Sequence, residues 1–98
     1  MSKYAFINGK CPTPDQLDVA KRAGIELVHV GGADQFTVSP GWVAARCPEA
    51  IGVVVSAPMA ALRLEHEYKI GVFQSSDNGD VLWLVDNMGR YMSRCGEV

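Results

Sequence analysis

The chain has 98 residues, a formal net charge of −2 and a hydrophobic fraction of 48%. This length suits a single domain spanning residues 1–98, with a real core but no room for a second domain. The 9 lysines and arginines are dispersed along the chain, so we expect no basic face and no duplex nucleic acid as a partner.

The cysteines and the apolar runs indicate the compartment. Cys11, Cys47 and Cys95 are odd in number and far apart, which is typical of reduced thiols rather than of a disulfide framework. The first residues run directly into a strand-like segment without the apolar region of a leader peptide. No apolar run approaches the ~20 residues of a membrane span. We therefore expect a cytoplasmic protein with no membrane segment.

The first two predicted elements are a strand and a helix. Residues 4–7 form a short apolar run that stops at the turn pair Asn8-Gly9. Thr13 then predicts a helix start, because it can cap the first turn, proline follows it, and Gln16 can close a capping box. Gly24 predicts the end of this helix. Its expected apolar stripe consists of Leu17, Ala20 and Ala23.

A second strand and a second helix follow. Residues 25–30 predict a strand that ends at Gly31-Gly32, and residues 33–38 have no clear pattern. Ser39-Pro40 predicts the start of a short helix that Pro48 closes. Residues 51–55 are continuously apolar, which is typical of a strand covered on both faces.

The remainder predicts a third helix and three more strands. The helix begins at Ser56-Ala57-Pro58 and carries Met59, Leu62 and His66 along one face. Strands are expected at residues 69–74, 81–85 and 90–93, the last at a sheet edge, with turns between them.

This order of elements predicts the fold class. Alternating strands and helices favour a parallel sheet, which the last strands extend in antiparallel fashion. We expect a small Rossmann-like, flavodoxin-like α/β domain. Residues 4–7 then lie centrally, with residues 25–30 on one side and residues 51–55 and 69–74 on the other.

Ligands of such sheets bind outside the carboxyl ends of the strands, where the strand order reverses. This point lies between the strands expected at residues 4–7 and 51–55, and the residues placed there are Asn8, Lys10, Cys11, Thr13 and Ser56, with Gly31 and Gly32 in the loop next to it. Two of the loops lead into helix N-termini and Lys10 adds a cation, which together favour a phosphate or a carboxylate. The alternative is that Thr13 and Ser56 are only helix caps and that the glycines only form turns.

The sequence lacks the motifs of several other kinds of site. The chain contains neither G-x-G-x-x-G nor G-x-x-x-x-G-K-[ST], and no serine lies in G-x-S-x-G. His29 and His66 lack cysteines or histidines at zinc-ligand spacing, so we expect no metal and no cofactor. The helix start could stabilise a thiolate at Cys11, but Leu17 stands where a phosphatase-type loop needs arginine. An enzyme that uses Cys11 or Asn8 remains a third alternative, with its catalytic residues unknown.

The loop also resembles a known group. Asn8, Pro12 and Thr13, within NGKCPTPDQL, resemble the opening of small CRISPR-associated proteins with a Rossmann-like fold. In that group the first strand ends in asparagine and an H-P-L-T-like motif opens the helix. Cys11 replaces the histidine before the proline, which puts any role of that position in doubt. The resemblance implies a fold related to domains that sense cyclic oligonucleotides.

Two functions from different classes follow. The first is a small nucleotide- or anion-binding domain, an accessory or sensor protein of a defence system. The second is a protein-interaction module of a mobile genetic element that acts through its C-terminal hairpin face and has no small-molecule site.

The predicted strand 81–85 is apolar on both faces. The helices are expected to cover only one of them. We therefore expect a homodimer with Trp83 or Tyr91 near the centre of its interface. The alternative is that Trp83 packs wholly inside its own subunit.

Overall fold

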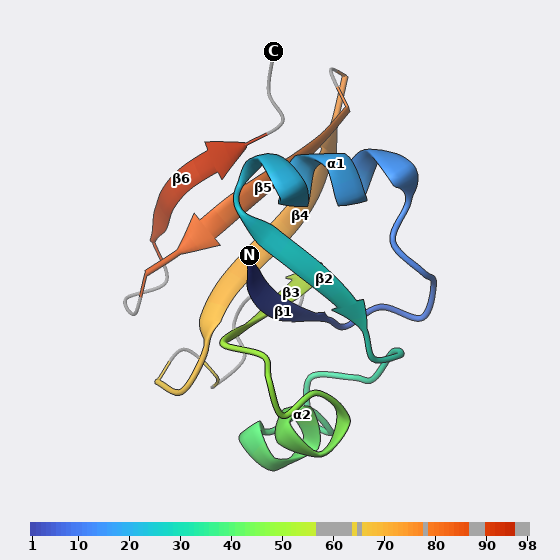
Figure 1. Ribbon diagram of the computed structural model, residues 1–98, viewed down its shortest axis with the longest axis vertical. Helices are drawn as coiled ribbons and strands as arrows, with labels where there is room; N and C mark the ends of the chain where they lie inside the picture. The colour runs from blue at the N-terminus through green and yellow to red at the C-terminus, as the bar shows by residue number, and fades with distance from the viewer. Residues whose placement is uncertain (57–63, 65, 78, 87–89, 96–98) are drawn as a thin grey trace.

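Strands and helices alternate in the first half of the chain, as Figure 1 shows for this computed structural model. The structure describes residues 1–56, 64, 66–77, 79–86 and 90–95. The elements are β1 (Ser2–Phe6), α1 (Pro14–Arg22), β2 (Ile25–His29), α2 (Pro40–Arg46), β3 (Gly52–Ser56), β4 (Lys69–Ser76), β5 (Gly79–Val85) and β6 (Tyr91–Cys95). The helix expected to start at Ser56-Ala57-Pro58 lies largely outside the described residues.

The strands form one mixed sheet in the order β2-β1-β3-β4-β5-β6. β1 pairs in parallel with β2 and β3, and β3 pairs in parallel with β4. β5 and β6 extend the sheet in antiparallel fashion. The predicted order of the first four strands, with β1 between β2 and β3, is therefore confirmed, and so is the position of the last strand at an edge.

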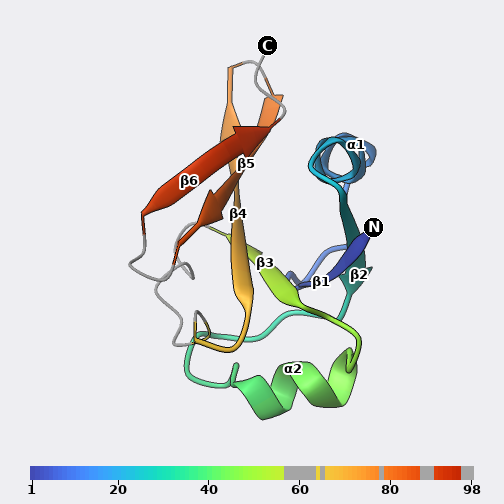
Figure 2. The same cartoon turned by 60° about the vertical axis from the view of Figure 1, so that its left-hand side comes forward.

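The two faces of the sheet have separate cores, because successive side chains of a strand point to opposite sides. Tyr4, Phe6 and Val54 face α1, whereas Ala5 and Val53 face α2. Val19 and Ala20 complete the first core, and Val43 and Cys47 complete the second. Figure 2 shows the two helices on opposite sides of the sheet. The continuously apolar β3 is thus explained by cover on both faces.

Local signals set the ends of α1 as predicted. The hydroxyl of Thr13 accepts a hydrogen bond from the backbone N–H of Gln16 at 3.1 Å, and the Gln16 side chain accepts one from the N–H of Thr13 at 3.1 Å. Gly24 follows the helix with a φ of 75°, a conformation that glycine adopts without strain. The predicted apolar stripe is wrong at Leu17, which is 46% exposed.

The C-terminal strands return to the first helix. α1 packs against β2 and also against β5 and β6, so the sheet curls around this helix (Figure 2). The thiol of Cys95 donates to the carbonyl oxygen of Val19 at 3.4 Å, and Leu82 is buried beneath α1. Val81 and Leu82, which point to opposite faces of β5, are both buried within the subunit.

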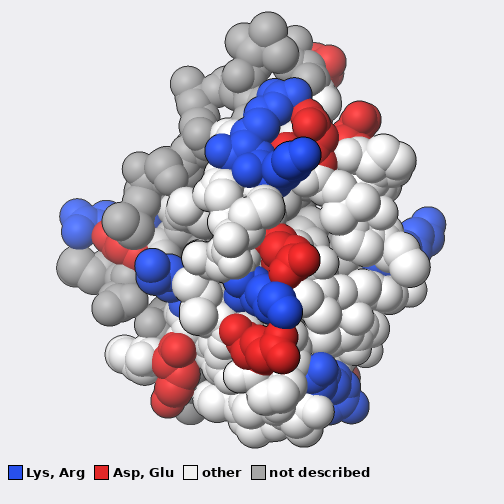
Figure 3. All heavy atoms as spheres, viewed as in Figure 1, with Lys and Arg blue, Asp and Glu red and all other residues white. Residues whose placement is uncertain are grey.

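The surface carries no broad patch of one charge on the side shown in Figure 3, where basic and acidic groups of the described residues are interspersed. Within the described part of the chain, no helix has the length and apolar character to cross a membrane.

Candidate functional site

The loops that follow β1 and β2 are joined at the carboxyl edge of the sheet. The N–H of Asn8 donates to the carbonyl oxygen of Gly31 at 3.0 Å. Gly32 lies so close to Gly9 that a Cβ atom added to Gly32 would be 2.8 Å from the Gly9 nitrogen. Such contact requires glycine at position 32. The two loops are therefore fixed to each other. The sequence predicted that they lie next to each other at this edge of the sheet.

His29 and Cys11 form a pair of chemically active side chains at this junction. The Nε2 atom of His29 is 2.8 Å from the backbone oxygen of Asn8, and Nδ1 is 3.6 Å from the sulfur of Cys11. A carbonyl oxygen only accepts, so Nε2 carries a proton and donates it to Asn8. In the neutral ring Nδ1 is then the acceptor, and the thiol of Cys11 donates to it.

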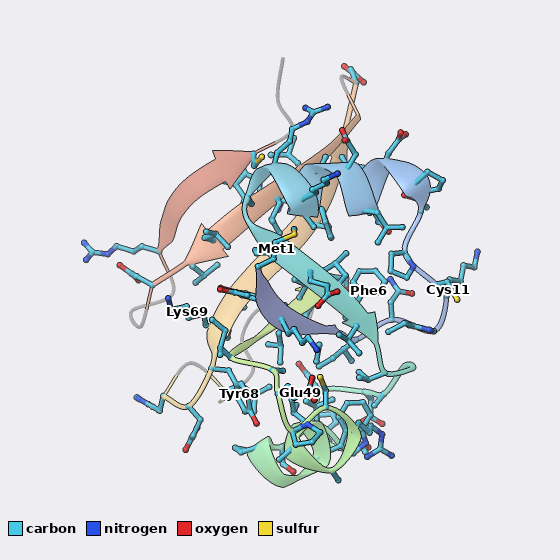
Figure 4. All side chains as sticks on the ribbon, viewed as in Figure 1. Met1, Phe6, Cys11, Glu49, Tyr68 and Lys69 are labelled. Carbon is cyan, nitrogen blue, oxygen red and sulfur yellow. The ribbon has the colours of Figure 1, made fainter. Side chains whose placement is uncertain are left out.

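The sheet register places this imidazole. His29 is the Cα partner of Phe6 in the parallel pairing of β1 and β2, so both side chains lie on the face that α1 covers. Their ring centroids are 6.2 Å apart with the rings tilted by 50°. Figure 4 shows Phe6 on the strand and Cys11 on the loop beyond its end. The aromatic contact and the bond to Asn8 together hold the orientation of the imidazole.

The start of α1 is less suited to an anion than its position suggested. Pro14 has no N–H, and the capping box already uses the N–H groups of Thr13 and Gln16. Asp15 is the remaining residue of the first turn, and its carboxylate opposes a second anion at the same place. The expected cradle made of helix N–H groups is thus largely occupied by the chain itself.

The other predicted site residues fall into two groups. Lys10 is exposed on the joined loops, where its backbone N–H donates to the side-chain oxygen of Asn8 at 3.0 Å. Ser56 ends β3, and β1 separates it from β2. Adjacent strands lie ~4.8 Å apart, so roughly 10 Å separate the backbones of β2 and β3. The structure therefore joins the loops of Asn8, Lys10, Cys11, Gly31 and Gly32, while Thr13 acts as a cap and Ser56 ends the strand on the other side of β1.

Asp34 in the neighbouring loop is used to build a turn. One of its carboxylate oxygens accepts hydrogen bonds from the N–H of Phe36 at 2.9 Å and from the N–H and hydroxyl of Thr37 at 2.8 and 2.9 Å. The bonds to Thr37 and Phe36 lower the pKa of the Asp34 carboxyl below its usual value. This carboxylate fixes the loop beside the site.

His29 is the residue that the sequence reasoning missed. Cys11 and His29 are 18 positions apart, far from any zinc-ligand spacing, so no motif in the sequence joins them. The signal lay in the predicted pairing of the first two strands, since parallel neighbours end at the same edge of a sheet. Among the described residues, no group of three or more histidine, cysteine or acidic side chains could hold a metal ion.

Comparisons with protein-family models, with curated proteins and with solved structures find no match to this chain. The geometry of the site is therefore the basis for inferring a function.

Proposed function

We propose that this protein binds a small anionic ligand at the carboxyl edge of β1 and β2. The observation that carries the proposal is the contact of Cys11 with His29 on two loops joined by the Asn8–Gly31 hydrogen bond, with the exposed Lys10 next to Cys11 in the chain. Residues 7–14 and 27–33 contain no aspartate or glutamate, and the nearest carboxylates in the chain are those of Asp15, Glu26 and Asp34 at their borders. Charge-assisted hydrogen bonds from a lysine are stronger than neutral ones, so the exposed Lys10 side chain favours an anion.

The strand order supports a more specific proposal for the class of ligand. Four parallel strands in the order β2-β1-β3-β4, with helices on both faces, support a small Rossmann-like arrangement. In such sheets nucleotides bind at this edge, so we propose nucleotides as the first ligand class to test. An accessory or sensor role in a cytoplasmic defence system would follow only if the ligand is a nucleotide.

The first prediction concerns binding itself. Titration with inorganic phosphate and then with ATP should shift the amide NMR signals of Lys10, Cys11, His29 and Gly31. A Lys10→Ala variant should bind about tenfold more weakly, because a lost charge-assisted contact is worth ~1.5 kcal/mol. Lys21→Ala, in the last turn of α1, is the matched control and should bind as the wild type does. No shift at these amides with millimolar ligand would contradict the proposal.

The alternative function, a protein-interaction module that acts through the C-terminal strands, predicts that the protein assembles through these strands. Trp83 is half-buried on β5, and β6 forms an edge of the sheet. An edge strand can pair with a second chain, so we propose a homodimer through the C-terminal strands. Val81 and Leu82, on opposite faces of β5, are both buried. The apolar face expected to remain uncovered on this strand is therefore limited to the part that carries Trp83.

Light scattering coupled to gel filtration should give the mass of a dimer at tens of micromolar. A Tyr91→Glu variant should shift the protein to the monomer, because a charge would be placed at the proposed interface. A wild-type protein that is monomeric at this concentration would contradict the proposed homodimer. A dimer that the variant leaves intact would place the interface elsewhere.

A further inference from the structure

We propose that Cys11 and His29 act together as a reactive thiol–imidazole pair that attacks small anionic disulfides, so that Cys11 is carried as a mixed disulfide. The preference for an anionic disulfide rests on the proposed anion-binding function. The reactivity of the thiol does not, since it depends only on the pair itself.

The two ring nitrogens of His29 have different partners and different roles. A reactive nucleophile is recognised by a base within hydrogen-bond reach and by a third group that orients the base. His29 Nδ1 lies 3.6 Å from the sulfur of Cys11, within reach of a hydrogen bond to sulfur. The backbone oxygen of Asn8 holds the proton on Nε2 at 2.8 Å. The lone pair of Nδ1 is thereby directed at the thiol.

The pair of Cys11 and His29 is both fixed in position and accessible to solvent. The ring of His29 contacts Phe6, and the loop that carries Cys11 is tied to the end of β2 through Asn8 and Gly31. Both Cys11 and His29 are nevertheless exposed. A disulfide from solution can therefore reach the sulfur without a change in the fold, and the base is already in place when it does.

The reaction is thiol–disulfide exchange. His29 Nδ1 takes the proton of the Cys11 thiol, and the thiolate attacks one sulfur of the small disulfide. The bond between the two sulfurs of that molecule breaks as the new bond to Cys11 forms. The leaving thiolate takes the proton from the imidazolium and departs as a thiol. Cys11 and one sulfur of the reagent end as a mixed disulfide, and the other sulfur is reduced.

The other cysteines differ in their surroundings. Cys47 is buried in the core on the α2 face, and the thiol of Cys95 donates to the carbonyl oxygen of Val19 in the second half of α1. Neither side chain is placed at the Cys11 loop. The adduct at Cys11 should accordingly persist until a thiol from solution releases it, which gives the site the character of a redox-sensitive modification site.

The test is mass spectrometry of the intact protein and of its peptides after exposure to oxidised glutathione, a disulfide of negative charge. We expect one adduct, located at Cys11, with Cys47 unmodified in the same sample. A His29→Gln variant should react on the order of tenfold more slowly near neutral pH. This effect is smaller than the usual contribution of a positioned base, because the pair is exposed to water. This difference should close in alkaline solution, where hydroxide removes the proton.

Three controls separate chemistry from structure. His66→Gln changes an exposed histidine elsewhere and should react at the wild-type rate. Added imidazole should restore part of the rate of a His29→Ala variant, which a purely structural role of His29 would not permit. Cystamine, a disulfide of positive charge, should react more slowly than oxidised glutathione, and Lys10→Ala should reduce that preference.

The outcomes distinguish this inference from the proposed function. Adduct formation that is slowed by His29→Gln, without any phosphate-induced NMR shift, would keep the reactive pair and reject the anion site. Phosphate-induced shifts that persist in Cys11→Ser, combined with no adduct in the wild type, would keep the anion site and reject the reactive pair. Equal rates for the wild type and His29→Gln near neutral pH would overturn the inference.

Discussion

Replacing Gly52 with alanine should destabilise the protein by about 3 kcal/mol, near the upper end of the usual cost of overpacking. A Cβ atom at this position would lie 2.5 Å from a ring carbon of Tyr4 and 2.6 Å from the backbone oxygen of Lys69. Tyr4 is only 4% exposed, and burial raises the pKa of its phenol. The ring therefore has no free space to enter, and the Lys69 oxygen belongs to the neighbouring strand.

Urea unfolding measures this effect, provided that the transition is two-state. Gly41→Ala is the matched control, because a Cβ atom there meets only the Ser39 hydroxyl at 3.9 Å. Gly41 lies inside α2, so alanine should stabilise the protein by ~0.5–1 kcal/mol. Equal effects of the two substitutions would contradict the close packing of Tyr4 over β3.

Truncating Leu82 to alanine should cost about 3 kcal/mol, within the range of ~2–5 kcal/mol for a buried leucine. Its side chain is 1% exposed and belongs to the core between the sheet and α1, with Phe6 and Val19. The loss combines the removed apolar contacts with the cavity that rigid neighbours leave open.

The same truncation at Leu17 gives the internal comparison. Leu17 is 46% exposed, and alanine is the better helix former, so Leu17→Ala should stay within ~0.5 kcal/mol of the wild type. Thermal or urea unfolding of both variants measures the difference. A large cost at Leu17 would show that the apolar stripe expected from the sequence does face the core.

The fold was largely predictable because its signals are local. The capping box at Thr13 and Gln16, the proline at the start of α2 and the apolar run of β3 each depend on neighbours in the chain. The buried side of α1 was predicted correctly at Ala20 and Ala23, which pack in the core, and wrongly at Leu17. Val19, outside the predicted stripe, is buried in the core that α1 shares with Leu82 of β5, and β5 and β6 both pack against α1.

The place of the candidate site was predicted only in part. The sequence placed a ligand between the ends of β1 and β3, with the Gly31-Gly32 loop next to it, whereas the joined loops follow β1 and β2. Parallel pairing brings the ends of β1 and β2 to one edge, so Asn8, Lys10, Cys11 and Gly31 were expected near one another. The pairing of Cys11 with His29 depends on the register that sets Phe6 beside His29. No local spacing encodes that register. The helix start failed as an anion cradle for the opposite reason, since its own capping residues consume the donors.

The curl of the sheet around α1 determines when this protein can fold during synthesis. The hydrogen bond from Cys95 to Val19 spans 76 residues, and Leu82 joins the same core from the far end of the chain. Ribosomes add roughly 5–20 residues per second, so the inner side of α1 is made several seconds before the strands that cover it. Such non-local contacts slow folding. The nascent N-terminal half therefore presents an incomplete apolar surface, and its native packing waits for the last two strands.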